Sequence, residues 1–579
     1  MLHPVDWAII AAYLLLALGV GLAMRGGSST GRRSYFLADR SLPWWWAGVS
    51  IAATTFAADT PLAVAGIIAS RGISGNWLWL SWILVHAGVV AVFARRWWRS
   101  DVVTDAEFIS RRYDDAATGT LRTFRAGLYG LVYNVIILGW VLRAMGKIAH
   151  PLVPWEEWAP GLTHAAARFV PEGSALGGPG EFLTILVLVL IVTLYSSLGG
   201  IRGVVRTDLV QFGLGMVGSI WLAVAAWRAV GGRAALHAQL QTLYGTESAD
   251  FLRLFPALDG GWAGALGLGA FTLGAYLLVQ GFANIPADGG GYLQQRLSAS
   301  RSETDAVRAA WLFVALQYLV RVWPWFVVGV AALVLIPLGD GTVSQLSPEL
   351  TATVRADREA AWPALMIALL PPGVIGLLVV ALLAAFMSTI DTHFNWGASY
   401  AVSDIFLRLR PGLSPRTQVT LGRVTVVGFA VLALLVAMQI ETIEQAWTWV
   451  AALGAALGAP TLLRWLWWRV TAFAELAGAV TGLTLAAVTA VLDVTYERQL
   501  VWIAGGSLLV TLAAIALGPG ANRNHAETFA RRVDAPGIWP GRSVAHGLRG
   551  LARELGTMAM VVALVLGGLM LGHWVLFVP

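Results

Sequence analysis

A chain of 579 residues that is 57% hydrophobic and only 12% charged, with a mean hydropathy of +0.70, does not have the composition of a soluble protein, which needs more charge to cover its surface. The absence of cysteine excludes a disulfide framework and a thiolate metal site. The net charge of +6 comes from arginines in short loops between apolar runs, which favours membrane orientation over nucleic-acid binding.

Fourteen apolar runs are long enough to cross a membrane, because one span needs about 20 mostly apolar residues. The first is expected to be a retained helix and not a signal peptide, because His3 and Asp6 precede it in place of a basic segment and no small-residue cleavage site follows. The run at 364–404 is too long for one helix, so it should include a lead-in segment outside the hydrocarbon. The expected spans are 6–24, 44–70, 76–94, 121–148, 183–199, 206–229, 263–283, 307–336, 364–404, 418–440, 443–466, 471–492, 500–517 and 554–577.

Arginine clusters and acidic residues alternate between successive loops. Arg95, Arg96 and Arg99 follow the third run, whereas Glu156 and Glu157 follow the fourth. Since cytoplasmic loops carry the excess of basic residues, we expect a multi-pass protein of the bacterial cytoplasmic (inner) membrane with both termini outside. The longest polar stretch, 518–553, is then an inside loop. No GxxxxGK[ST] motif is present, so ATP is not the expected energy source.

The second span contains Asp59 and Pro61 together with three threonines. Proline removes a backbone donor, and a membrane helix breaks only where the freed groups face protein or water. The break would turn the carbonyls of Ala53 and Phe56 inward, and a charge at this depth indicates a functional site. The alternative is a proline kink with Asp59 at a wet interface.

Two later spans carry further breaks or polar groups. The seventh ends in Pro286, Asp288 and three glycines, which indicates either a second unwound segment or the ordinary cytoplasmic end of a helix. The ninth carries Ser388 and Thr389, whose hydroxyls suit a hard cation that prefers oxygen ligands. Such hydroxyls also commonly bond the carbonyl four residues back or a neighbouring helix.

Several motifs occur in an order and spacing that resemble the sodium:solute symporter family, which includes sodium/proline and sodium/glucose symporters. The resemblance covers about residues 6–490. The motifs are Ser34–Trp45 followed by Gly48, Thr104–Tyr113, Gly199–Gln211, Gln295–Arg296, Ser388–Asp391, Asp404, Leu463–Arg469, Gly478 and Gly482.

The resemblance implies an all-α polytopic membrane protein with the inverted-repeat transporter fold, in which spans 2–6 and 7–11 form the two five-helix halves. The expected division is an extra helix and inside loop at 1–43, the first repeat at 44–230, the second at 231–466, and additional helices at 467–579.

The resemblance also implies a sodium site between the broken second span and the ninth span. Its ligands would be the carbonyls of Ala53, Phe56 and Ala385 and the hydroxyls of Ser388 and Thr389. Asp208 matches a family aspartate thought to attend sodium release toward the cytoplasm. Sodium is the only metal or cofactor expected.

The substrate pocket is expected near the midplane between the repeats. The candidate residues are Asp59, Thr60, His86, Asn134, Gly281, Asn284, Asp288, Trp447 and Trp449. His86 on an apolar helix is also typical of a packed histidine. Gly290 and Gly291 stand where many members carry Asn or Asp followed by Gln, and Asp59-Thr60 differs from the sugar members, so no family substrate is carried over.

These features predict a secondary active transporter, not an enzyme, that couples inward sodium movement to uptake of a small polar organic solute by alternating access. Its other contacts would be membrane lipid and, in a homodimer, a second copy; a monomer is equally expected, and nucleic acid is not a partner. The alternatives are proton coupling through Asp59 or Asp391, a sensor that works with a separate signalling chain, and a membrane-embedded transferase, for which the outside loops carry no recognised motif.

Overall fold

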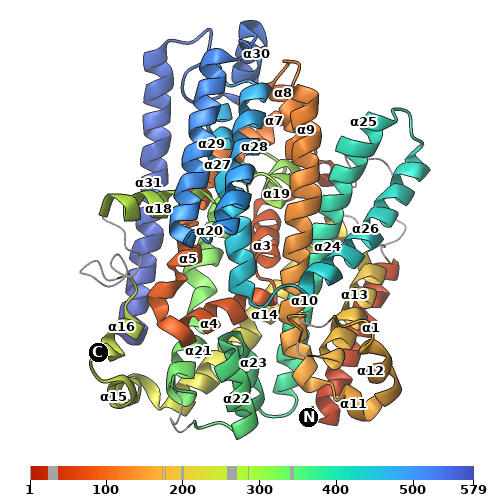
Figure 1. Cartoon of the computed structure of the whole chain (residues 1–579), viewed down its shortest axis with the longest axis vertical. Helices are drawn as coiled ribbons and strands as arrows, with labels where there is room; N and C mark the ends of the chain where they lie inside the picture. Colours follow the sequence, from red (N-terminus) through yellow and green to blue (C-terminus); the bar gives the residue numbers. More distant parts are fainter. Residues whose placement is uncertain are drawn as a thin grey trace.

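The computed structural model describes residues 2–23, 37–171, 174–176, 178–196, 201–256, 270–283, 286–339 and 344–579. Across these ranges the regular structure is helical, and strand-like pairing is limited to two isolated bridges. Figure 1 shows long helices that run along the longest axis and surround the short, central α3.

Helices up to the seventh predicted span alternate long apolar segments with short connecting ones. They are α1 (Pro4–Ala23), α3 (Trp44–Thr54), α4 (Asp59–Arg71), α5 (Trp77–Leu80), α6 (Ile83–Gly88), α7 (Ala94–Ser100), α8 (Asp105–Arg112), α9 (Thr118–Gly127), α10 (Asn134–Ala149), α11 (Trp155–Trp158), α12 (Pro160–Ala166), α13 (Pro179–Ser196), α14 (Ile201–Val230), α15 (Gly232–Tyr244), α16 (Ser248–Leu252) and α18 (Ala270–Phe282).

The remaining helices complete the bundle and add a C-terminal group. They are α19 (Tyr292–Ala299), α20 (Glu303–Ala315), α21 (Val322–Leu335), α22 (Pro348–Ala356), α23 (Ala361–Leu369), α24 (Val374–Tyr400), α25 (Leu407–Leu409), α26 (Pro415–Ala437), α27 (Ile443–Leu466), α28 (Ala472–Val491), α29 (Tyr496–Leu517), α30 (Arg523–Val533) and α31 (Val544–Phe577).

In the described part of the chain, nine helices are long and apolar enough to cross a membrane, or eleven if each of two bent pairs counts as one span. Three more predicted spans coincide with the helices α1, α13 and α18. The number 14 therefore stays a prediction, whereas the multi-pass, all-helical architecture is confirmed.

The second predicted span is broken, as its polar cluster indicates. Its two halves, α3 and α4, meet at an angle of 55°. Small residues let neighbouring helices approach the halves closely: a side chain at Gly48 would lie 2.8 Å from the carbonyl oxygen of Ala309, and one at Gly329 would lie 3.0 Å from that of Ala65. The break is therefore held inside the bundle.

The seventh predicted span ends at Phe282, and turns at 286–291 lead into α19. Gly289 and Gly291 have φ values of 70° and 69°, which glycine adopts without strain. All eight residues of α19 are buried, so α19 is an internal segment and not a surface loop. This burial favours the unwound-segment interpretation over an ordinary helix end.

The long run at 364–404 is divided as expected. The helix α23 ends at Leu369, and α24 begins at Val374 after Pro371 and Pro372. Pro363 lies in the first turn of α23, where proline is tolerated. Pro371 and Pro372 lie in the connection after α23, because proline does not continue a helix. A separate lead-in segment therefore precedes the ninth span.

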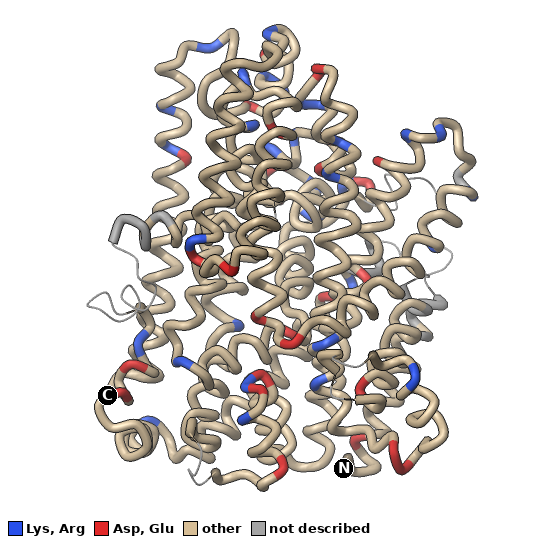
Figure 2. Tube along the Cα trace, viewed as in Figure 1, with Lys and Arg blue, Asp and Glu red and all other residues tan. Residues whose placement is uncertain are grey.

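Both chain ends lie at one end of the molecule, and α30 lies at the other (Figure 1). The α30 segment is fixed there by an aromatic cluster in which Phe529 packs against Phe108 and Trp539. Figure 2 shows arginines near α25 and α30, at the end opposite the termini. The termini thus share a side, while the side they face and the domain limits stay predictions.

Candidate functional site

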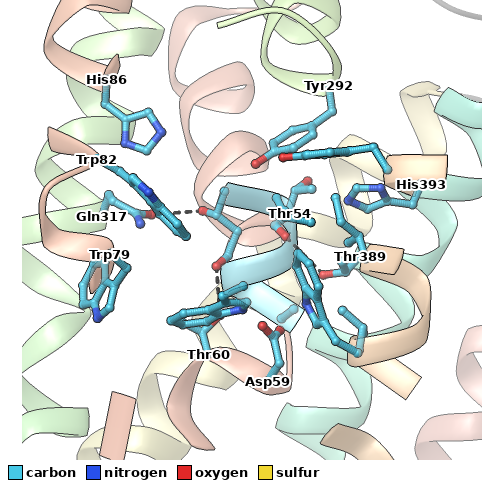
Figure 3. Close-up of a pocket in the computed structure, with 18 of the residues that line it drawn as sticks. Thr54, Asp59, Thr60, Trp79, Trp82, His86, Tyr292, Gln317, Thr389 and His393 are labelled. Carbon is cyan, nitrogen blue, oxygen red and sulfur yellow. Dashed lines mark hydrogen bonds between the residues drawn. The ribbon is translucent and has the colours of Figure 1, made fainter. Parts of the chain in front are cut away.

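A cavity of about 90 Å³ lies at the break between α3 and α4. By this measure one water needs roughly 10–15 Å³, so the cavity has room for several waters or one small solute. Figure 3 shows polar and aromatic side chains that converge on the break from several helices. The lining residues are Thr54, Thr55, Ala57, Asp59, Thr60, Trp79, Trp82, His86, Tyr133, Ile137, Trp140, Val141, Tyr292, Gln317, Arg321, Thr389, His393, Trp447 and Val450.

Asp59 is the first residue of α4 and faces the cavity from the break. Its side chain is buried, and Trp447 lines the cavity with it. Its Oδ1 atom has no hydrogen-bond partner within the described residues. The neighbouring Thr60 hydroxyl donates to the carbonyl oxygen of Thr55 at 3.3 Å, which closes the break locally. Of the two alternatives at this position, the structure favours an internal charge over a wet interface.

Arg321 stands opposite the other half of the broken span. Its Nη1 atom donates to the carbonyl oxygen of Ala52 and to the Thr55 hydroxyl, each at 2.9 Å. Gln317 lies four residues earlier and accepts from the same hydroxyl at 3.1 Å. Because the C-terminal end of a helix is negative, the guanidinium stabilises the end of α3 beside the cavity.

A π-helical turn at Leu316–Val320 separates α20 from α21 and presents this polar group. Turns of this kind are frequent at functional sites. We did not predict Gln317 or Arg321 from the sequence. The signal was available, because a charged side chain within the apolar run at 307–336 is a functional hypothesis by default.

The two buried histidines of the cavity differ in their bonding. His86 Nδ1 lies 2.8 Å from the Tyr318 hydroxyl, and its Nε2 is without a partner in the part of the chain that is described. His393 Nδ1 lies 2.7 Å from Asn134 Oδ1, and the Asn134 amide donates to the His393 carbonyl oxygen at 3.0 Å. His86 therefore has an unused ring nitrogen at the cavity, whereas Asn134 is occupied in holding α10 to α24.

Four of the predicted pocket residues line the cavity, namely Asp59, Thr60, His86 and Trp447. Asn284 lies outside the described residues. Gly281 packs against Leu84 and the Ser81 carbonyl, and Trp449 is 38% exposed on the outer face of α27. Neither of these two is a lining residue, and neither is Asn134.

Asp288 also lies away from the cavity, in a buried polar network toward α30. Its Oδ2 accepts from Arg464 Nη2 at 2.5 Å and from Trp465 Nε1 at 2.6 Å, and its carbonyl accepts from Trp97 Nε1 at 2.7 Å. The turns at 286–291 carry Asp288 to the α7 and α27 ends. We misplaced it because the sequence does not reveal how far an unwound segment travels.

The predicted sodium ligands lie at the end of α3 and in the middle of α24. The Thr389 hydroxyl donates to the carbonyl oxygens of Thr54 at 3.2 Å and Ala385 at 3.1 Å. The carbonyl of Ala53 accepts from the Phe56 N–H at 3.0 Å within the break. Oxygen atoms of the two elements therefore lie side by side, which is the donor set that a hard cation prefers.

Asp208 of α14 connects the same two elements. Its Oδ1 accepts from the Ser388 hydroxyl, and its Oδ2 accepts from the Ser50 hydroxyl at 2.5 Å. Asp208 is completely buried, and Arg296 approaches to 4.0 Å. Ser50, which the sequence analysis missed, thus shares one carboxylate with a predicted sodium ligand.

Comparison with known proteins identifies the family of the chain. A profile of the sodium:solute symporter family matches residues 35–139 and 165–482. The chain belongs to the sodium:solute symporter family. It is therefore a multi-pass membrane protein of a family of sodium-coupled transporters, as the motifs predicted.

Several similar proteins are sodium cotransporters. The sodium/glucose cotransporter of Vibrio parahaemolyticus is 24% identical over 506 residues, which cover 83% of this chain and 84% of the relative. Sodium/glucose cotransporter 4 of Danio rerio is 23% identical over 86% of this chain and 73% of its own length. Sodium/myo-inositol cotransporter 2 of Mus musculus is 25% identical over 86% of this chain and 71% of its own length.

Among solved structures, a Na⁺-coupled sialic acid symporter in a substrate-bound, outward-open state superposes with a TM-score of 0.67 at 17% identity. The match covers 90% of this chain and 99% of the symporter. The inverted-repeat transporter fold is therefore confirmed for this symporter-family chain.

Proposed function

We propose that this symporter-family protein couples inward sodium movement to the uptake of a small polar solute by alternating access. The observation that carries the proposal is that two neighbouring hydroxyls of α24 reach other helices at one place: Thr389 bonds to the Thr54 carbonyl at the end of α3, and Ser388 bonds to Asp208 of α14. Sodium would be held by the carbonyls of Ala53, Phe56 and Ala385 with those two hydroxyls, and Asp208 would assist its release. The solute would occupy the neighbouring cavity.

The neighbouring positions of the two sites provide the coupling. Thr54 and Thr389 line the cavity, and the same pair joins α3 to α24 at the sodium residues. A cation that orders this junction also orders the cavity wall, so sodium favours solute binding, and the solute must tighten sodium binding by the same factor.

The energy available is sufficient for uptake. One sodium ion that moves down a potential of about 100 mV supplies about 2.3 kcal/mol. Since about 1.4 kcal/mol corresponds to a tenfold ratio, one ion supports a solute gradient of roughly fortyfold.

The test is the thermal unfolding of the purified protein in NaCl and in equimolar choline chloride. A ligand that binds only the folded state stabilises it by about 2.7 kcal/mol at a hundred times its dissociation constant. We expect a sodium-specific rise in Tm that the double variant Ser388→Ala/Thr389→Ala loses.

The matched control is Ser399→Ala/Ser403→Ala, which removes two hydroxyls further along the same span. The Ser399 hydroxyl bonds only to the Trp396 carbonyl of its own helix, and the Ser403 hydroxyl has no partner in the described ranges. The control should keep the sodium shift. Equal Tm values in both salts, together with uptake driven by a pH gradient, would replace sodium coupling with proton coupling.

A further inference from the structure

Two side chains of opposite charge line the cavity but do not form an ion pair with each other. Asp59 and Arg321 both line it, and each is at least 97% buried. Among the described residues neither takes part in an ion pair within 4.0 Å, and Asp59 Oδ1 and Arg321 Nε have no hydrogen-bond partner. A buried charge without a counter-charge is costly, so two of them at one cavity call for an occupant.

The broken span explains how the two charges are kept apart. Arg321 is fixed to the carbonyl end of α3 through Ala52 and Thr55, and Asp59 begins α4. Each charge complements the helix end beside it, since the carbonyl end is negative and the amino end is positive. The protein therefore presents one carboxylate and one guanidinium to the same small space in fixed positions.

The cavity walls suit a charged organic group at each of these positions. Trp447 and Trp82 line the cavity together with Asp59, and their rings lie 5.9 Å apart. Aromatic faces beside a carboxylate attract organic cations. Beside Arg321, the Gln317 amide adds a neutral hydrogen-bonding group, and a guanidinium recognises a carboxylate through paired N–H donors. Figure 3 shows Asp59 and Gln317 at different points of the cavity wall.

We propose that the solute is a small zwitterion, whose cationic group binds at Asp59 and Trp447 and whose carboxylate binds at Arg321 and Gln317. A neutral polyol would leave both protein charges without a counter-charge, and a solute with one charge would leave one. The cavity of about 90 Å³ restricts the solute to few heavy atoms. The inference rests on the proposed symport and specifies its substrate class.

The first experiment measures the Tm of the purified full-length protein in NaCl with four pools of probes. They are neutral amino acids with betaines, monocarboxylates, organic ammonium ions, and glucose with myo-inositol. We expect the zwitterion pool alone to raise the Tm beyond the effect of sodium. The largest shift from any other pool, or no shift from any pool while sodium itself acts, would overturn the inference.

A matched trio then refines the result for the active subclass. Glycine betaine carries both charges, 3,3-dimethylbutyrate keeps its shape and carboxylate without the positive charge, and choline keeps the ammonium without the carboxylate. The corresponding trio is used if an amino acid is the active member. Each single-charge analogue should bind about tenfold to hundredfold more weakly, the range expected when a charged hydrogen-bonding partner is lost. Equal binding of the zwitterion and either analogue would refute the assignment.

Variants assign each charge to its residue. Asp59→Asn should transfer the preference from zwitterions to monocarboxylates, and Arg321→Gln should transfer it to organic ammonium ions. Because Arg321 also supports the α3 end, Arg321→Lys is the second variant and should keep the zwitterion preference at lower affinity. The controls Asp250→Asn and Arg253→Gln remove an exposed charge pair and should leave all preferences unchanged.

The result is separable from the proposed sodium coupling. If sodium produces no shift but the zwitterion pool does, the substrate class stands and sodium coupling fails. If the Asp59→Asn and Arg321→Gln preferences remain those of the unmodified protein while the sodium shift is intact, the substrate assignment fails and the coupling stands.

Discussion

Replacing Asp288 by asparagine should destabilise the α30 end of the protein through a single missing charge. The network around Asp288 contains three acids and three arginines, which are Asp105, Asp288, Glu475, Arg112, Arg125 and Arg464. All six are buried, with Arg464 2.5 Å from Asp288 and Arg125 2.5 Å from Glu475.

Asp288→Asn removes the carboxylate nearest to the buried Arg464 guanidinium. The Arg464 guanidinium keeps only the longer contact with Glu475, at 3.4 Å, and Glu475 is already shared with Arg125. Removing one partner of a buried ion pair typically costs about 3–5 kcal/mol. We expect a loss in that range in the free energy of unfolding.

The assay is equilibrium unfolding in mixed micelles for Asp288→Asn, Arg464→Gln and the double variant. The double variant should lose less than the sum of the two single losses, because removing both charges leaves neither unpaired. Asp250→Asn is the control, since exposed pairs contribute about 0–1 kcal/mol. A loss below about 1 kcal/mol for Asp288→Asn, or strict additivity in the double variant, would refute the reasoning.

Three further predictions test other parts of the structure. Burial raises the pKa of Glu359 above its ordinary value of 4.5, so the protonated side chain stabilises the fold below about pH 4.5 and this stabilisation is lost as the pH rises through the folded-state pKa. The difference in Tm between Glu359→Gln and the unmodified protein should therefore shift in favour of the variant across that interval. Parallel Tm profiles of the two proteins would contradict this. A methyl group at Gly215 would clash with the Phe56 ring, whereas one at Gly213 meets no described atom within 4 Å. Gly215→Ala should therefore cost about 1–3 kcal/mol and weaken the sodium shift, while Gly213→Ala does neither. Phe529→Ala should cost about 3–5 kcal/mol in unfolding measurements, because the ring is 97% buried in the cluster that fixes α30; a cost below about 1 kcal/mol would show that this segment is not held by its aromatic residues.

The sequence predicted those parts of the site that depend on local chemistry. The break between α3 and α4 follows from Asp59, Pro61 and the threonines around them, because proline and a charge within an apolar run conflict with a continuous membrane helix. The hydroxyls of Ser388 and Thr389 were selected by their type and by the family motif. The structure places these elements together, whereas sodium binding itself stays a prediction.

The sequence did not predict contacts that join distant segments. Arg321 was visible as a charge in an apolar run, but the π-helical turn that directs it toward α3 has no sequence signature. Asn134 was selected as a polar residue on an apolar helix, and its bonds with His393, 259 residues away, occupy it. Asp288 was assigned to the pocket because it follows a helix break, and only the path of the turns shows that it belongs to the α30 network.

The cavity lies between two buried polar networks, and in the proposed symport this arrangement bears on how a solute would leave it. At the α30 end, Arg464 and Asp288 join α27 to the turns before α19. At the end that carries the termini, the Glu359 carboxylate accepts from the first N–H groups of α27 and lies 2.5 Å from Lys147. A buried ion pair contributes little net free energy compared with the same two groups in water. Opening a path through either network, which hydrates its charges, therefore costs little free energy. An apolar seal of the same size would expose hydrocarbon with no compensation. For the proposed symport we therefore expect alternating access to proceed by hydration of one network at a time. The helix α27 contributes to both networks and would link their states.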